Sequence, residues 1–229
     1  MVAPALLITG GVTLASRAGV INPGHTVLPY PLFVLFGTLL WLVFAEAVEV
    51  PHQAFEGARS YLTRVNFSRE SIILSQLYES LITTAVRLLL ALLLLAIVSG
   101  VDLRSIALVS ICFIGAVLLG LGIGSLLMPF TLLFADLHNT IKLILSYGLF
   151  LTPAMYQPQE DGLFATLVRI NPVWPLMDSA REAGAGVALS HPQALAVVLC
   201  GGILTTILGL ALVRAVSPIV VERMLLGGR

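Results

Sequence analysis

The sequence predicts an all-α membrane protein that crosses the bilayer several times. Of its 229 residues, 58% are hydrophobic and only 10% are charged, and the mean hydropathy is +1.02. Soluble domains are about 45–50% apolar and about 25% charged. Six apolar runs with the character of a membrane-spanning helix, one of them partial, account for most of the chain.

The first run, within 1–19, is short for a full span, because about 20 apolar residues are needed to cross the hydrocarbon core. It also lacks the basic segment that begins a secretory signal. We expect a transmembrane helix whose beginning is missing, with a signal peptide as the alternative. Five further runs follow, at about 32–50, 79–99, 106–134, 141–156 and 193–214. The separators resemble turns, and a single membrane domain, 1–229, is expected.

The segment 157–192, between the last two spans, contains two moderately apolar pieces. They cover 162–170 and 173–183 and are separated by Asn171 and Pro172. Each piece is too short to span a bilayer and too apolar for a free loop. We expect re-entrant or interfacial short helices on the outer side of the membrane.

The run 106–134 carries Ala116, Gly120 and Gly124 at four-residue spacing. Small residues at this spacing let helix backbones approach closely in lipid. The pattern predicts a packing face for a neighbouring helix rather than a ligand site.

Lysine and arginine predict the orientation, because short cytoplasmic loops carry an excess of them. With a cytoplasmic N-terminus, seven lie in inside segments and four in outside segments. The inside residues are Arg59, Arg64, Arg69, Lys142, Arg214, Arg223 and Arg229, and the outside residues are Arg17, Arg104, Arg169 and Arg181. We therefore expect both termini to be cytoplasmic.

No pattern of catalytic or metal-binding residues stands out, so we expect no enzyme, metal or cofactor in this chain. The four histidines, which we expect on different loops, lack the spacing of a metal site. They are His25, His52, His138 and His191. Cys112 and Cys200 fall in apolar runs and are expected to be buried, not bonded to each other. The formal net charge of zero disfavours nucleic acid as a partner.

Three ionisable residues fall within predicted spans, where charge is costly. Glu46 and Glu49 lie late in the second span, and Arg87 lies about two turns into the next, from the same side. We expect them to pair across adjacent helices or to reach the headgroups. A proton relay is the alternative.

Aromatic residues cluster around the second span, among them Tyr30, Phe33, Trp41 and Phe44. Aromatics near span ends usually form a belt at the membrane interface. The alternative is that they line a passage on which sugar rings stack.

The segment 59–71, RSYLTRVNFSRES, is a compact polar and basic island between two apolar runs. It has no neighbouring residues for catalysis. A solvated loop that fixes orientation and a contact surface for another protein both remain open on these residues alone.

Four stretches, taken together and in order, resemble the membrane subunit of ABC-2 type exporters, in the group that exports O-antigen, teichoic acid and other polysaccharides. They are PYPLFVLFGTLLWLVFAEAV (29–48), TRVNFSRESIILS (63–75), LLFADLHNTIKLILSYGLFLTPAMY (132–156) and INPVWPLMDSAREAGAG (170–186). The resemblance covers the chain from about residue 6. The family commonly has a proline where this chain has Ser68.

The resemblance implies a multi-pass protein of the bacterial inner membrane that exports a lipid-linked polysaccharide. It implies a homodimer, with ATP bound and hydrolysed on two separate ATPase subunits. The island would then be the ATPase contact. Phe67 would fill an apolar pocket of the ATPase, while charged residues surround that contact. The residues assigned to the contact are Arg64, Phe67, Ser68, Arg69 and Glu70.

Three other functions remain as alternatives. The chain could belong to an ABC-2 exporter of a small drug or lipid. It could be a membrane scaffold that transports nothing, in which case no ATPase would co-purify. It could also be an ion- or proton-coupled carrier, which is supported only by Glu46, Glu49 and Arg87. Such a carrier would be expected to show inverted halves, and the sequence shows none.

Overall fold

The computed structural model describes residues 2–20, 26–62, 69–98, 100, 102–157, 166, 168 and 170–226. Within these ranges the chain forms α-helices joined by turns, and no strand occurs. The predicted all-α class is confirmed.

Four long helices dominate the structure: α2 (Tyr30–Leu62), α3 (Arg69–Val98), α4 (Leu103–Leu133) and α8 (Pro192–Leu226). Each contains a segment long and apolar enough to cross a membrane. Those segments are Tyr30–Ala58, Ser71–Val98, Leu103–Leu133 and Pro192–Val216. Four of the predicted spans therefore correspond to helices of sufficient length, and they indicate a membrane protein.

Three shorter helices complete the described part of the chain. α1 (Ala3–Arg17) has 15 residues, α5 (Ala135–Leu151) has 17, and α7 (Trp174–Gly184) has 11. α1 and α5 correspond to two further predicted spans, but both are shorter than the about 20 residues that crossing requires. The expected count of six spans therefore stays a prediction.

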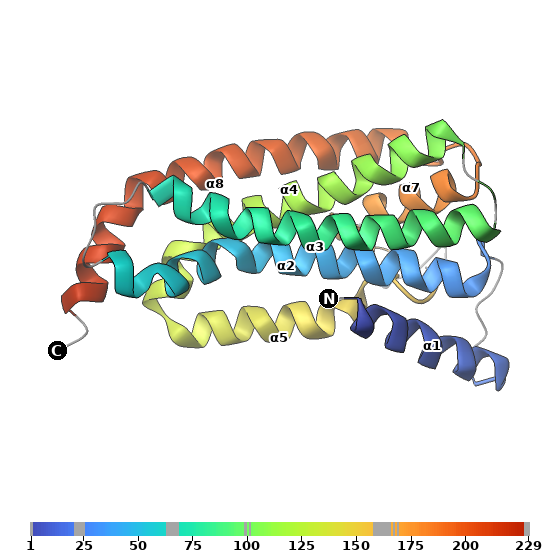
Figure 1. The fold of residues 1–229 in the computed structure, drawn as a ribbon, viewed down its shortest axis with the longest axis horizontal. Helices are drawn as coiled ribbons and strands as arrows, with labels where there is room; N and C mark the ends of the chain where they lie inside the picture. Colours follow the sequence, from blue (N-terminus) through green and yellow to red (C-terminus); the bar gives the residue numbers. More distant parts are fainter. Residues whose placement is uncertain are drawn as a thin grey trace.

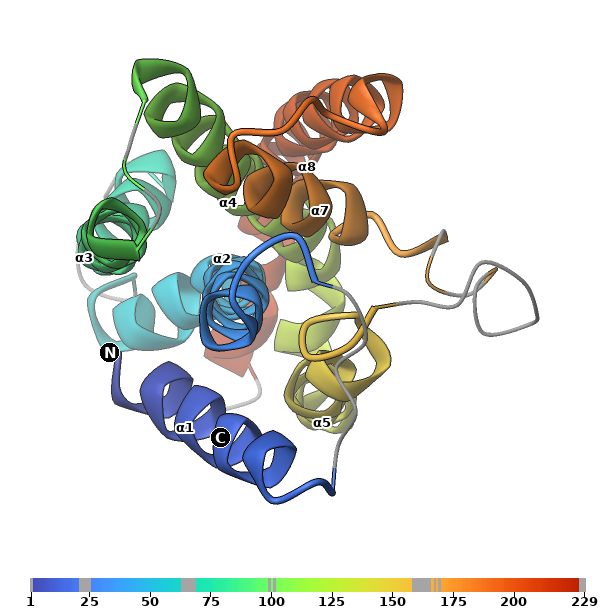
Figure 2. The ribbon, with the colours of Figure 1, turned by 90° about the vertical axis from the view of Figure 1, so that its right-hand side faces the viewer.

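The long helices run roughly along one axis of the molecule, as Figure 1 shows. Viewed end-on in Figure 2, α2 lies in the middle, with α3 on one side, α1 and α5 on another, and α4 on a third. α8 packs on α4. One end of the bundle holds the end of α2, the start of α3, the α4–α5 junction and the end of α8 (Figure 1). The opposite end holds the α3–α4 junction and α7.

α4 packs closely on both α2 and α8, because it has glycines, which lack side chains, on the two sides that face these helices. A Cβ atom added at Gly120 would lie 2.5 Å from the carbonyl oxygen of Phe44 in α2, and one at Gly124 would collide with the Val48 carbonyl. Gly122 faces α8 in the same way, where a Cβ would lie 2.6 Å from the backbone nitrogen of Thr206. The predicted packing face is confirmed, and a second one joins it.

α2 extends well beyond the predicted limit of its span at residue 50. It continues through Pro51 to Leu62, and its last turns bend away from the first part in Figure 2. Proline lacks the N–H that a helix interior requires and its ring clashes with the preceding turn, so a helix that continues past a proline is kinked there. The first residues of the polar island therefore belong to α2 and the last to α3.

Candidate functional site: a polar groove between α2 and α5

One face of α2 carries a line of polar side chains. Glu46, Glu49, Gln53 and Glu56 follow one another at spacings of three, four and three residues. Residues at such spacings lie on the same side of an α-helix. The facing residues come mostly from α5, so the line becomes one wall of a groove.

Arg87 of α3 forms an ion pair with Glu46. Its Nη2 atom lies 2.6 Å from Oε2 of Glu46, and the Arg87 side chain is only 7% exposed. Charged groups at membrane depth are costly unless they are paired, so this contact compensates both groups. The structure thus brings together two of the three charges that were expected to pair.

The third charge, Glu49, has other partners. Its carboxylate lies 3.9 Å from Nζ of Lys142 in α5 and accepts a hydrogen bond of 3.3 Å from Nε2 of Gln53. The Glu49 side chain is 12% exposed, whereas that of Lys142 is 53% exposed. Lys142, which the sequence predicted only as one of the cytoplasmic basic residues, is therefore part of this site.

Two histidines meet at the far part of the groove. The rings of His52 and His138 are stacked, with centroids 3.5 Å apart and planes inclined by 13°. His52 also has Nδ1 3.0 Å from Oγ1 of Thr131 and Nε2 3.6 Å from Oε2 of Glu56. The expectation that the histidines lie on different loops was wrong for this pair, since His52 is in α2 and His138 in α5.

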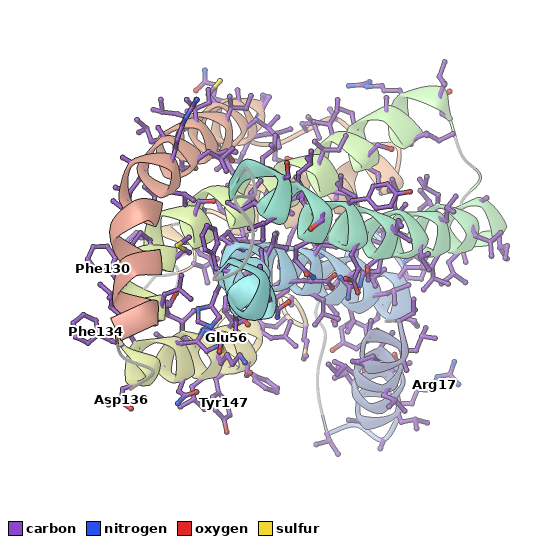
Figure 3. The ribbon with its side chains drawn as sticks, turned by 60° about the vertical axis from the view of Figure 1, so that its left-hand side comes forward. Arg17, Glu56, Phe130, Phe134, Asp136 and Tyr147 are labelled. Atoms are coloured by element: carbon purple, nitrogen blue, oxygen red, sulfur yellow. The ribbon has the colours of Figure 1, made fainter. Side chains whose placement is uncertain are left out.

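These groups surround two adjoining cavities. One, of about 430 Å³, lies around Glu46, Glu49 and Arg87 and reaches Trp41. The other, of about 520 Å³, lies around the two histidines. Gln53 and Lys142 line both, so we treat the two cavities together as one polar groove. Figure 3 shows the end of this groove at Glu56, beside α5.

The groove shows no sign of a metal centre. Among the described residues, no group of three or more histidine, cysteine, aspartate or glutamate side chains is arranged to hold a metal ion. Both cysteines are free thiols, Cys112 buried as expected and Cys200 exposed on α8, which corrects the prediction for Cys200. Cys200 faces outward because α8 contacts the bundle along only one side.

Phe33, Trp41 and Phe44 of α2 lie inside the bundle and do not form an outward-facing belt, whereas Tyr30 is half-buried. Phe33, Trp41 and Phe44 are 2%, 6% and 7% exposed. The indole nitrogen of Trp41 donates a hydrogen bond of 2.9 Å to the carbonyl oxygen of Leu145 in α5. Gly148 makes room for this ring, because a Cβ there would lie 2.5 Å from the indole. Trp41 therefore packs α5 against α2, and it forms one end of the groove.

A second polar cluster, missed by the sequence argument, surrounds Arg181 of α7. Its guanidinium donates hydrogen bonds to the carbonyl oxygens of Phe33, Pro153 and Ala154, at 3.2, 2.9 and 2.7 Å. It also lies 3.6 Å from the centre of the Phe33 ring. Gly37 leaves the space, since a Cβ there would collide with the guanidinium.

The charge of Arg181 is retained although the side chain is only 2% exposed. Burial lowers the pKa of Arg181 to about 9, and the Asp178 carboxylate opposes that shift. The group is therefore protonated at neutral pH. Burial in turn raises the pKa of Asp178, with Glu182 adding to the shift and Arg181 and His191 opposing it. A sequence signal existed, because an arginine in an amphipathic eleven-residue helix needs partners once that helix is buried.

α7 corresponds to the predicted piece 173–183, but it lies within the bundle. It contacts α2, α4 and α8, and its residues from Pro175 to Gly184 are mostly buried. Of the piece 162–170, the structure describes only residues 166, 168 and 170. A re-entrant or interfacial arrangement of these two pieces stays a prediction.

The expected ATPase contact lies largely outside the described residues. Arg64, Phe67 and Ser68 are not among them. Arg69 and Glu70 are the first residues of α3, and only their backbone is described. The assignment of this contact stays a prediction.

In comparisons with known proteins, no protein-family model matches the chain. No curated protein is similar to it at a significant level either.

Proposed function

We propose that this chain is the membrane subunit of an ATP-driven exporter that moves a lipid-linked polysaccharide across the bacterial inner membrane. In this proposal the chain works as a homodimer, and ATP is hydrolysed on two separate ATPase subunits. The chain itself performs no catalysis and holds no cofactor.

The cluster at Arg181 is the observation that carries the proposal. Arg181 belongs to the stretch 170–186, and its acceptors belong to the stretches 29–48 and 132–156. Asn171 adds a hydrogen bond of 2.8 Å to Thr152, and the Tyr30 hydroxyl donates one of 3.0 Å to the carbonyl of Met155. Three of the four stretches that resemble the exporter family thus interlock at one place, which supports treating them as parts of one functional unit.

The polar groove supports a passage for a substrate rich in hydroxyl groups. Carboxylate, amide, imidazole and amine groups line it over the length of two cavities, and Trp41 lies at one end. Sugars are bound by such hydrogen-bonding groups together with aromatic faces. An exporter of a small drug or lipid would share this bundle. The hydrogen-bonding groups that line both cavities favour the polysaccharide.

The proposal includes a finer topology than the four long helices. α1 and α5 would be two further, shorter spans, and α7 would be an outer re-entrant element. Both termini would be cytoplasmic, together with the segment 59–71. The end of the bundle that joins α2 to α3 would then face the ATPases.

Co-purification tests the proposal. The full chain is purified from its native membranes in mild detergent, and ATP hydrolysis and the co-purifying proteins are measured. We expect an ATPase subunit at a stoichiometry near one per chain. If no ATPase co-purifies with the native chain, the exporter function is refuted. That result would favour the alternative that the chain is a membrane scaffold that transports nothing.

Two variants test the contact within the same experiment. Phe67→Ala and Arg69→Ala should each lower the recovery of the ATPase, because they remove the apolar anchor and a surrounding charge. Arg104→Ala is the matched control, since Arg104 is exposed at the opposite end of the bundle. If both variants recover as much ATPase as the native chain, the segment 59–71 is not the ATPase contact. The proposed exporter function would not be contradicted by that result.

A further inference from the structure

A second, largely apolar cleft opens on the side of the bundle away from the polar groove. α3 packs mainly on α2 and α8 mainly on α4, and α3 and α8 contact each other little. A cavity of about 560 Å³ lies between them, with Leu121 of α4 in its lining. Ile73 of α3 and Leu121 of α4 form its buried floor. Its walls are apolar residues of α3 and α8, namely Leu74, Leu77, Leu210 and Ala211.

The polar residues of this cleft are confined to one end of it. Ser71 and Arg214 line the cavity, and both are exposed. Ser71 lies near the start of α3, which begins at Arg69, and Arg214 is the last residue of the predicted span 193–214. Both therefore lie towards the end of the bundle that the distribution of basic residues predicts to be cytoplasmic, while the apolar part of the cleft extends away from that end.

We propose that this cleft binds a phospholipid with an anionic headgroup. The phosphate lies at the rim beside the Arg214 guanidinium and the Ser71 hydroxyl, and one acyl chain fills the cleft down to Leu121. A guanidinium matches a phosphate in charge and in hydrogen-bonding geometry. This inference depends on insertion into a membrane but not on transport.

The position of the charge singles out a lipid among the occupants of an apolar cleft. An apolar helix of a protein partner would offer no anionic group to the end of the cleft that holds Arg214. A phospholipid instead changes from charged to apolar along its length, as this cleft does from Arg214 to Leu121. Basic residues at a membrane boundary also attract anionic lipids over neutral ones.

Native mass spectrometry of the purified full chain tests the proposal. The protein is exchanged into detergent with equal amounts of phosphatidylglycerol and phosphatidylcholine, and the lipids retained per chain are counted. Arg214→Gln should lower the retained phosphatidylglycerol about fivefold, since one basic residue near an anionic surface contributes about 1 kcal/mol. Retained phosphatidylcholine should not change. Arg104→Gln, at an exposed site at the other end of the bundle, should change neither lipid.

A second pair of variants tests the apolar part of the cleft. Leu77→Trp places a larger side chain in the cleft and should displace phosphatidylglycerol even with Arg214 intact. Leu204→Trp is the control, because Leu204 is 57% exposed on α8 and does not line the cavity. Equal retention in Arg214→Gln, Arg104→Gln and the native chain would overturn the proposal. It would also be overturned if Leu77→Trp altered the oligomeric mass of the protein while the retained lipid stayed the same.

Discussion

Arg181 shows how one buried charge can organise several segments of a membrane protein. Its planar guanidinium donates to carbonyl oxygens of α2 and of the turn that follows α5, and it lies against the face of the Phe33 ring. Pro153 and Ala154 lie in that turn, whose backbone carbonyls have no helical partner. The arginine thus satisfies acceptors that would otherwise be buried without a donor.

We predict that Arg181→Ala lowers the free energy of unfolding by about 2–6 kcal/mol, because the buried carbonyl oxygens of Pro153 and Ala154 lose their donor at a cost of about 1–3 kcal/mol each. Arg181→Lys should recover only part of the loss, because an ammonium keeps the charge but not the planar fork. Denaturant unfolding in detergent measures both. Arg17→Ala, at an exposed position, is the control and should change stability by less than about 0.5 kcal/mol. A loss no larger for Arg181→Ala than for Arg17→Ala would refute the role of Arg181.

At the scale of the element, α4 is the helix on which the others are assembled. It is apolar on all sides, as expected for a helix surrounded by neighbours. In a bilayer, lipid chains are as apolar as leucine, so close backbone contact replaces the hydrophobic effect as the source of association. Glycines on the sides that face α2 and α8 allow this contact.

We predict that Gly124→Ala lowers the free energy of unfolding by about 1–3 kcal/mol, the usual cost of excess volume in a packed core. The added Cβ would collide with the Val48 carbonyl of α2, which is backbone and cannot rotate away. Gly201→Ala is the matched control in α8, where nothing lies within 4 Å of the added atom. There we expect a gain of about 0.5–1 kcal/mol from the better helix former. A neutral Gly124→Ala would contradict the close approach of α2 and α4.

At the scale of the whole molecule, the helices divide the polar loops between two ends of one bundle. Two of the residues labelled in Figure 3, Arg17 at the end of α1 and Asp136 at the start of α5, are exposed and lie far apart. Among the described residues assigned to the inside, Arg59 lies at the end of α2, Arg69 at the start of α3, and Arg214 and Arg223 in the last part of α8, all towards the end that holds Asp136. The distribution of positive charge therefore predicts which end faces the cytoplasm.

We predict that a membrane-impermeant maleimide labels Arg17→Cys in intact cells with an opened outer layer, and labels Asp136→Cys only after the inner membrane is permeabilised. The background is Cys200→Ser, because Cys200 is exposed whereas Cys112 is buried. The measure is the fraction of protein that gains the mass of the label. If Asp136→Cys is labelled before permeabilisation and Arg17→Cys is not, the orientation is the reverse of the proposed one. If both variants are labelled before permeabilisation, the two positions lie on the same side of the membrane.

The sequence was enough to predict the all-α class, the four long apolar helices among the six expected spans, and the packing face of α4. Those features follow from local patterns, namely long apolar runs and small residues four positions apart. The ends of α2 were less predictable, because the helix passes through Pro51 with the support of its neighbours. The pairing of Glu46 with Arg87 was one of several arrangements that the sequence left open. Glu49 pairs with Lys142 and not with Arg87.

By itself, the sequence determined the helical class and the long apolar segments that indicate a membrane protein, together with the few charges that fall within those segments. Only the tertiary structure decided which of these charges meet, that His52 stacks on His138, and that Arg181 joins three distant segments. The reason is physical. Burial in a bilayer depends on local composition, whereas the partner of a buried polar group depends on how helices far apart in the chain pack against one another.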